Sequence, residues 1–419
     1  MAKVLISFLG TGGVINKKQE ESPITDREPR EYRKANYTIN GESIGNFSFV
    51  SLALKEKYKA QKVLMIGTVR SMWEEVYKNL KQIKDKDYQA INDSFYFDIA
   101  EHCEKSNYNS ELYIPHKEEI EKELGEGSHI SLIKYGLNEQ EIQDNINIIL
   151  SLDDYIKDGD ELIVDITHSF RSLPVMVMQL LIYLKTISKK NIRITHIFYG
   201  MLDITKELGH TPIVDLTSIL NINDWIIGAY AFKNYGNGSI ISKQMEDENK
   251  SVAALIDDFS KAMSLNHIQA IKKQVQRLSS IKNIAYSNKI PEMIIPPSIK
   301  EFIDTFDRIE KNSLFELKLA EWQSHHHNYA AAYISLIEAI ITYVCENNGL
   351  DHTNPDNRKD AKGIIFDRRK PEYSTIKNMF DKLNTNRKKV AHSLESTSSI
   401  LKMINELNDG IKFFKGIIK

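Results

Sequence analysis

The chain has 419 residues, of which 42% are hydrophobic and 27% charged, as is typical of a globular protein with buried cores. Its length favours two or three domains. The formal net charge of -2 excludes a strongly basic field over the whole molecule, so any nucleic-acid site must be a local patch. The two cysteines, Cys103 and Cys345, fit neither a disulfide framework nor a metal motif, which predicts a reducing, cytoplasmic location. No run of about 18 apolar residues occurs, so we expect no membrane span.

The first half of the chain alternates short apolar strands with helices. Apolar runs that end in turn residues predict strands at 3–10, 62–68, 161–167 and 192–200. Helical spacing of apolar residues predicts helices at 48–59, 72–84, 140–156 and 172–188. This order predicts an α/β domain with a parallel, doubly wound sheet covered by helices on both faces. In such sheets, ligands bind beyond the carboxyl ends of the strands.

From about residue 215 the pattern becomes helical. Amphipathic helices are predicted at 245–264, 268–285, 296–311, 328–348, 374–393 and 398–417. The second half is therefore expected to be all-α.

Three predicted strand-end turns share a chemistry. They offer hydroxyl groups, backbone N–H groups at helix starts, an arginine and aromatic faces, which suit phosphates and stacked bases. The residues are Thr11, Gly12, Thr68, Ser71, Trp73, Thr167, His168, Ser169, Phe170 and Arg171. Each glycine or threonine, taken alone, is better explained as an ordinary turn residue, and the alternative for His168 is a half-buried structural histidine. The first turn lacks the full G-x-G-x-x-G pattern, which argues against a nicotinamide site.

These turns lie in segments that resemble a known family. KVLISFLGTG (3–12), YRKANY (32–37), IGTVRSMWEEV (66–76) and VDITHSFRSLP (164–174) are similar to the motifs of CARF domains, and most similar to CARF–HEPN ribonucleases of type III CRISPR systems. The resemblance implies a Rossmann-like CARF domain over 1–215, a linker with connecting helices over 216–295, and an all-α HEPN ribonuclease domain over 296–419. It implies no cofactor. The ten turn residues would bind an allosteric activator, a cyclic oligoadenylate, with tetra-adenylate as the expected ring size.

The symmetry of such a ring favours a homodimer. A cyclic oligonucleotide with an even number of units fits a two-fold axis, and a homodimer presents every strand-end turn twice about that axis.

In the helical half, the stretch TNRKKVAHS (385–393) contains Arg387 and His392. This spacing recurs by chance on basic helices, but it also resembles the R-x-x-x-x-H motif of HEPN ribonucleases. A histidine titrates near neutral pH and can move the proton of a ribose 2′-hydroxyl, while an arginine stabilises charge on the phosphorane. This chemistry requires no metal, and it yields a 2′,3′-cyclic phosphate.

The spacing also constrains how the two side chains meet. On an ideal helix, five residues turn about 140° beyond one revolution, so Arg387 and His392 do not share a face. Either the helix is distorted, or two chains pool their residues in a cleft, as the resemblance implies. Asn386, Lys388 and Lys389 are the expected RNA-binding residues. The family often has a polar residue directly after the arginine, where this chain has Lys388.

Together with the chemistry of Arg387 and His392, the resemblance implies a cyclic-oligoadenylate-activated, metal-independent endoribonuclease that cleaves single-stranded RNA in antiviral defence. An additional hypothesis is that the CARF-like domain slowly degrades its own activator through His168, Ser169 and Arg171. The alternative is a non-catalytic, nucleotide-sensing regulator whose helical half serves dimerisation or partner binding. The run of three histidines at 325–327 has no partners at metal-ligand spacing, so we expect no metal site there.

Overall fold

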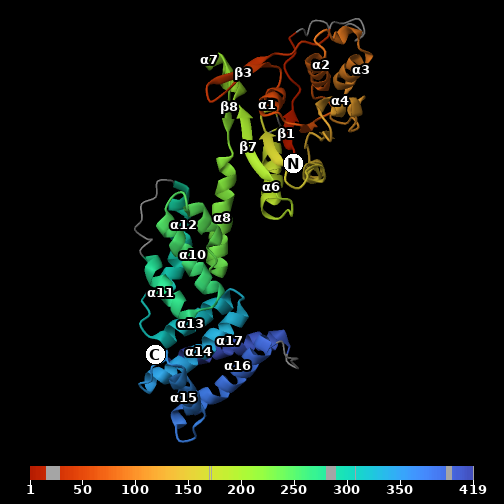
Figure 1. Ribbon diagram of the computed structural model, residues 1–419. Coiled ribbons are helices and arrows are strands. Elements are labelled where there is room, and N and C mark those ends of the chain that lie inside the picture. The colour runs from red at the N-terminus through yellow and green to blue at the C-terminus, as the bar shows by residue number, and fades with distance from the viewer. Residues whose placement is uncertain are drawn as a thin grey trace. The chain divides into compact units, whose positions relative to one another are not determined.

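The computed structural model describes residues 1–15, 29–168, 170, 172–279, 289–306, 308–392 and 399–418, without the side chains of residues 296, 298, 391 and 392 (Figure 1). The chain divides into two compact units, Met1–Leu220 and Asn221–Lys419.

The first unit is built on a mixed sheet. The described strands form one eight-stranded sheet in the order β3-β2-β8-β7-β6-β1-β4-β5. Its central part is parallel and consists of β7 (Arg193–Gly200), β6 (Glu161–Asp165), β1 (Lys3–Leu9), β4 (Lys62–Gly67) and β5 (His129–Leu132). Beside β7, β8 (Thr211–Asp215) runs antiparallel to it. The next strand, β2 (Ala35–Ile39), pairs in parallel with β8 and forms a hairpin with β3 (Glu42–Phe47), which is the edge strand on this side.

Helices cover both faces of this sheet. Successive residues of β1 point to opposite faces: Leu5 packs with the core that includes Trp73, whereas Ile6 packs with the core that includes Leu180. The first face carries α1 (Val50–Tyr58), α2 (Trp73–Lys84), α3 (Ser94–Lys105) and α4 (Lys117–Leu124), and the second carries α5 (Glu139–Leu150) and α6 (Leu173–Thr186). A short helix, α7 (Thr205–Leu208), precedes β8. The predicted α/β, doubly wound class is confirmed, with the addition of an antiparallel edge.

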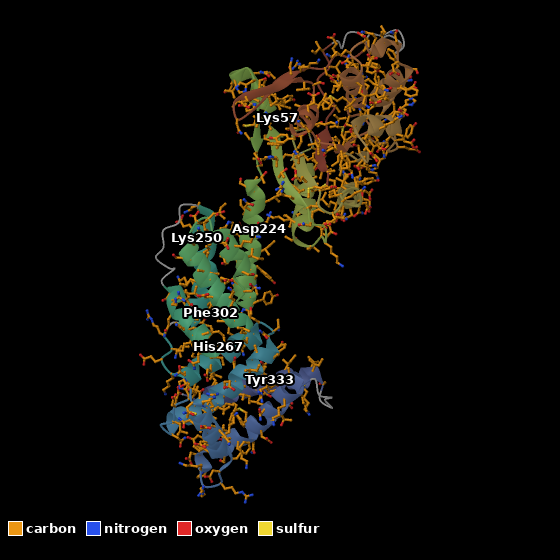
Figure 2. All side chains as sticks on the ribbon, in the orientation of Figure 1. Lys57, Asp224, Lys250, His267, Phe302 and Tyr333 are labelled. Atoms are coloured by element: carbon orange, nitrogen blue, oxygen red, sulfur yellow. The ribbon has the colours of Figure 1, made fainter. Side chains whose placement is uncertain are left out.

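The second unit is helical throughout its described residues. One core lies among α8 (Ser218–Tyr235), α9 (Ser239–Met245), α10 (Lys250–Ser264), α11 (Ile268–Leu278), α12 (Lys289–Phe306) and α13 (Asn312–His325). A second core joins α13 to α14 (Tyr329–Asn347), α15 (Pro355–Phe366), α16 (Ser374–His392) and α17 (Ile400–Ile417). Figure 2 labels Phe302 of the first core and Tyr333 of the second. The all-α prediction for this half is confirmed, while the boundaries predicted at 215/216 and 295/296 stay predictions.

Polar side chains mark where these helices begin. The side chains of Asn328, Asn354 and Ser399 each accept a hydrogen bond from a backbone N–H in the first turn of α14, α15 and α17. Within the described ranges, α14 alone has the length and apolar composition of a membrane span, but 61% of that stretch is buried inside the protein. We therefore regard α14 as the central core helix of this unit.

Candidate functional site

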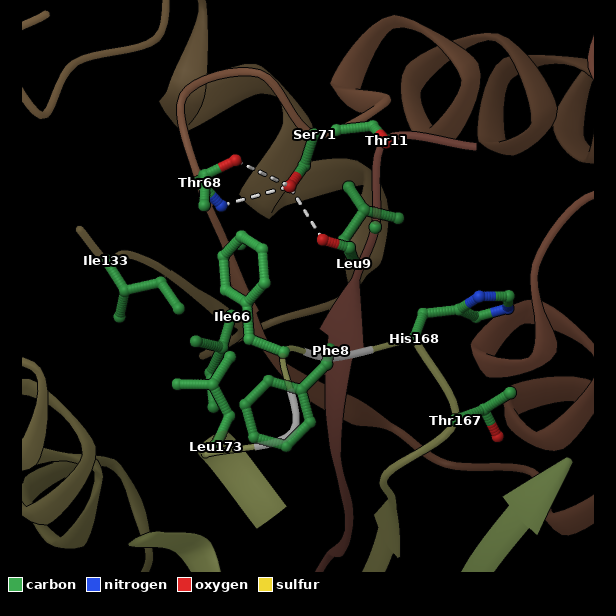
Figure 3. Close-up of a pocket in the computed structure, with 13 residues that line it drawn as sticks. Phe8, Leu9, Thr11, Ile66, Thr68, Ser71, Ile133, Thr167, His168 and Leu173 are labelled. Carbon is green, nitrogen blue, oxygen red and sulfur yellow. Dashed lines mark hydrogen bonds between the residues drawn. The ribbon is translucent and has the colours of Figure 1, made fainter. Parts of the chain in front are cut away.

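A cavity lies at the carboxyl ends of β1, β4 and β6, where the sequence places the strand-end turns (Figure 3). Its volume is about 270 Å³. Of the predicted ligand-binding residues, Thr11, Thr68, Ser71, Thr167, His168 and Phe170 line it. Gly12 and Trp73 do not, and Ser169 and Arg171 lie outside the described residues.

The floor of the cavity is apolar, and the sequence did not predict it. Phe8 and Ile66 are the second-to-last residues of β1 and β4, Ile133 follows β5, and Leu173 begins α6. An apolar surface beside hydroxyl groups suits a flat heterocyclic base, which has an apolar face and polar edges.

The second turn is held by its own side chains. The Ser71 hydroxyl donates to the carbonyl oxygen of Leu9 at 2.6 Å and accepts from the backbone N–H of Thr68 at 3.0 Å. The indole N–H of Trp73 donates to the carbonyl oxygen of Thr68 at 2.8 Å. Both Ser71 and Trp73 are buried. The prediction that Trp73 contacts ligand is therefore corrected: its ring supports the turn from within the core.

The first turn keeps backbone donors available. Among the residues that the structure describes, no hydrogen bond occupies the N–H groups of Thr11, Gly12 or Gly13. Gly12 has a φ of +66°, in the left-handed region that favours glycine. Unpaired N–H groups at a strand end can bind an anion such as a phosphate.

The third turn directs its polar groups toward other parts of the fold. The backbone N–H of Val50 donates to Nε2 of His168 at 3.4 Å, and the N–H of Gly200 donates to the Thr167 hydroxyl at 2.7 Å. Figure 3 shows the His168 ring and the Thr167 side chain directed away from Ile66 and Leu173. Burial lowers the pKa of His168, although the nearby Asp165 opposes this, so the imidazole is neutral and accepts at Nε2.

The second unit carries the predicted catalytic motif on α16. This helix continues through His392, and Arg387 is half-buried with its Nε donating to Asn384 Oδ1 at 3.2 Å. No acidic side chain among the described residues forms an ion pair with Arg387, so its guanidinium is available to an anion. Lys388 is exposed and Lys389 half-buried. The side chain of His392 lies outside the described residues.

Asn386 differs from its predicted role. It is only 4% exposed, and its amide nitrogen donates to Glu406 Oε2 at 2.6 Å and to the Tyr333 hydroxyl at 3.2 Å. Burial tends to raise the pKa of Glu406, but the hydrogen bonds from Asn386 and Lys382 outweigh this and hold it below the ordinary value. The prediction that Asn386 contacts RNA is corrected: it joins α16 to α14 and α17 beside Arg387.

Two of the three consecutive histidines have separate hydrogen-bond partners. His326 Nδ1 lies 2.8 Å from the carbonyl oxygen of Trp322, and His327 Nδ1 lies 2.8 Å from the Tyr329 hydroxyl. Across the described parts of the chain, no group of three or more His, Cys, Asp or Glu side chains has an arrangement that could hold a metal ion.

Two family models match this chain. Residues 4–203 match the CARF domain of the CRISPR system endoribonuclease Csx1, and residues 221–313 match the second domain of CRISPR-associated protein MJ1674. The first range contains every residue that lines the cavity. The chain contains a CRISPR-associated CARF domain. It is 31% identical to CRISPR-associated protein MJ1674 of Methanocaldococcus jannaschii over 436 aligned positions, which cover 100% of this chain and 66% of that relative.

A solved structure also matches this chain over most of its length. Csm6 of Enterococcus italicus, bound to cyclic hexa-2′-fluoro-hexa-dAMP, covers 99% of this chain and 93% of its own, at 13% identity and a TM-score of 0.33. Helices α14–α17, which carry Arg387, lie outside the two matched ranges but inside the alignment with the M. jannaschii relative.

Proposed function

We propose that this protein is an endoribonuclease switched on by a cyclic oligoadenylate. The activator binds in the CARF cavity, and Arg387 and His392 of the second unit cleave single-stranded RNA. One observation carries the proposal. The same chain holds a nucleotide-sized cavity at the strand ends of a CARF domain and an R-x-x-x-x-H motif on a helix whose arginine has no acidic partner among the described residues.

The size of the cavity supports a ligand shared between two chains. A cavity of about 270 Å³ is smaller than the roughly 300–1,000 Å³ that encloses a drug-sized molecule. It suits one base with its ribose rather than a whole ring. A cyclic tetranucleotide would therefore extend onto a symmetry-related copy of the cavity, as in a homodimer.

An apolar stripe on α6 supports the same dimer. Val175 and Tyr183 are exposed on α6, the helix that begins at Leu173, a residue that lines the cavity, and the exposed Ile187 directly follows the end of this helix. Covering this stripe with a second copy would bury apolar surface and bring two cavities together.

The helical geometry supports a composite catalytic cleft. Because α16 is helical through His392, the local distortion that would bring Arg387 and His392 onto one face of one chain is not seen in the described backbone. With the two residues about 140° apart around the axis, a second chain would supply the missing partner.

The chemistry follows from these residue types. His392 takes the proton of a ribose 2′-hydroxyl, whose oxygen attacks the adjacent phosphorus, and the bond from phosphorus to the 5′-oxygen breaks. Arg387 stabilises the charge on the phosphorane, and an imidazolium returns a proton to the leaving 5′-oxygen. Lys388 and Lys389 attract the RNA backbone, while Asn386, held by Glu406 and Tyr333, keeps α16 in place. The products are a 2′,3′-cyclic phosphate and a 5′-hydroxyl.

We do not extend the proposal to degradation of the activator. His168 Nε2 already accepts a hydrogen bond from the Val50 N–H, so it does not face the cavity as a free base. The activator raises the rate of cleavage because it binds the RNA-cleaving conformation of the protein more tightly than the inactive conformation.

An RNA cleavage assay against a panel of cyclic oligoadenylates, with EDTA present, tests this function. We expect one ring size, the tetra-adenylate, to raise the rate by roughly 100-fold if about 1% of the free protein is active. EDTA should leave the rate unchanged, and the 3′ ends should carry 2′,3′-cyclic phosphate. Binding of a ring without cleavage of any RNA would contradict the proposal and favour a non-catalytic regulator.

A further inference from the structure

A buried carboxylate lies behind the first turn of the cavity. Glu74, in the first turn of α2, is 0% exposed, and its Oε1 accepts hydrogen bonds from the Tyr32 hydroxyl at 2.5 Å and from Arg30 Nη1 at 3.0 Å. Burial and the charge of Glu74 raise the pKa of Tyr32, so its hydroxyl stays protonated and acts as the donor. The Arg30 side chain is 24% exposed whereas that of Glu74 is fully buried, so this ion pair holds a carboxyl group inside the core at a desolvation cost.

This network reaches the cavity through the ring of Tyr32. A Cβ atom placed on Gly12 would lie 2.5 Å from Cδ1 of Tyr32 and 2.7 Å from Sδ of Met72, so Gly12 is enclosed between these two side chains. A backbone hydrogen bond joins the same two segments: the N–H of Arg33 donates to the carbonyl oxygen of Gly13 at 2.9 Å. Thr11, which precedes Gly12, lines the cavity.

Arg30 fixes the other end of the network. Its Nη2 lies 3.1 Å from Glu104 Oε2, and its backbone N–H donates to the Tyr96 hydroxyl at 2.8 Å. The Tyr32 hydroxyl therefore donates to the carboxylate of Glu74, which belongs to α2 and is linked to α3 through Arg30. Tyr32 cannot shift its ring away from Gly12 without losing the bond to Glu74.

We propose that Glu74 and Tyr32 are positioning residues of the activator site. They hold the turn of Thr11, Gly12 and Gly13 in its binding shape before the activator arrives, with its unpaired N–H groups available to a phosphate. Neither side chain lines the cavity, so both act through the turn rather than by touching the ligand. This inference rests on the proposed function, because it assigns the cavity to a phosphate-bearing activator.

Tyr32→Phe tests the inference, since it removes the hydroxyl and keeps the ring against Gly12. We expect the activator concentration for half-maximal RNA cleavage to rise about tenfold, which corresponds to about 1.4 kcal/mol. The cleavage rate at saturating activator should stay at the wild-type value, because the loss lies in binding. The matched control is Tyr77→Phe: Tyr77 lies on α2, as Glu74 does, but its hydroxyl donates to Asp93 Oδ2 at 3.1 Å rather than to Glu74. It should not shift the half-maximal concentration.

Equal shifts in the two variants, or no shift in Tyr32→Phe, would overturn the inference. Glu74→Gln is a second variant for the case that Tyr32→Phe does not fold. It keeps the shape of the side chain and weakens both hydrogen bonds, so we expect a smaller rise in the activator concentration for half-maximal cleavage. Calorimetric binding of cyclic tetra-adenylate to the wild-type protein distinguishes a failure of the proposed function from a failure of this inference alone. No binding by the wild type refutes the proposed function and this inference together, whereas normal binding by both wild type and Tyr32→Phe refutes this inference alone.

Discussion

Arg387→Ala is expected to lower the rate of RNA cleavage by about 10²–10³-fold, and His392→Ala by about 10²–10⁴-fold. The first variant removes the cation that stabilises the phosphorane, and the second removes the group that transfers the proton. Both residues lie on α16 in the second unit, whereas the cavity for the activator lies in the first. Calorimetry should therefore find activator affinity unchanged in both variants.

Lys388→Ala is the matched control for charge. Lys388 follows Arg387 directly and is exposed, so its loss removes one positive charge from the same helix without touching the phosphorane. We expect weaker binding of long RNA and a shallower salt dependence, by roughly 0.7 in the log–log slope for one lost phosphate contact. The maximal rate should stay within about twofold of wild type. A wild-type rate in Arg387→Ala would contradict the assignment.

Glu316→Gln is expected to stabilise the protein at and above pH 8. Glu316, on α13, is buried, and burial raises its pKa to about 8 from an unfolded value of 4.5. The charged groups around it are Arg358 of α15, Glu338 and Glu346 of α14, and Lys272 of α11. Arg358 already pairs with Glu338, so it does not neutralise Glu316 alone.

The sign of the pH effect follows from proton binding. Between about pH 4.5 and pH 8, the folded protein keeps the proton on Glu316 and the unfolded chain releases it, so the free energy of unfolding falls as pH rises through this window. The loss is on the order of 4 kcal/mol. Glu316→Gln should remove this dependence, which denaturant unfolding at pH 5 and pH 8 can measure.

Glu321→Gln provides the control on the same helix. Hydrogen bonds from Lys415 and Lys318 outweigh burial and lower the pKa of Glu321, so its titration lies below this window. The control should therefore show the same change between pH 5 and pH 8 as the wild type. A Glu316→Gln variant with the wild-type pH dependence would show that Glu316 is ionised in the folded protein.

Strands β1, β4, β6 and β7 and most helices could be predicted because their apolar patterns are strong, whereas the short strand β5 was missed. Strand β1 and helix α2 were expected at 3–10 and 72–84 and are found at Lys3–Leu9 and Trp73–Lys84. The β2–β3 hairpin was missed although its turn, Asn40–Gly41, has both φ angles positive, as two-residue hairpins favour. Helix α8 was missed because its apolar residues do not gather on one face: Trp225 is buried, while Ile226 and Tyr230 are exposed.

The site was predicted in position but not in detail. The turns could be found because the carboxyl ends of parallel strands meet at one edge. The apolar floor could not, because Phe8 and Ile66 look in sequence like any other buried strand residues. The hydrogen bonds of Trp73, His168 and Asn386 could not be predicted from the sequence either, because tertiary packing determines their partners. These partners are Thr68, Val50 and Glu406.

A heterodimer of Arg387→Ala and His392→Ala chains tests the composite cleft most directly. The two variants carry different affinity tags, are produced together and are purified through both tags, and RNA cleavage is measured with saturating activator. Each homodimer lacks one kind of catalytic group, but the heterodimer keeps one arginine and one histidine, on different chains. We predict that it recovers about half of the wild-type rate, because one of two symmetry-related pairs is restored. A heterodimer no faster than either parent homodimer would contradict a site shared between chains.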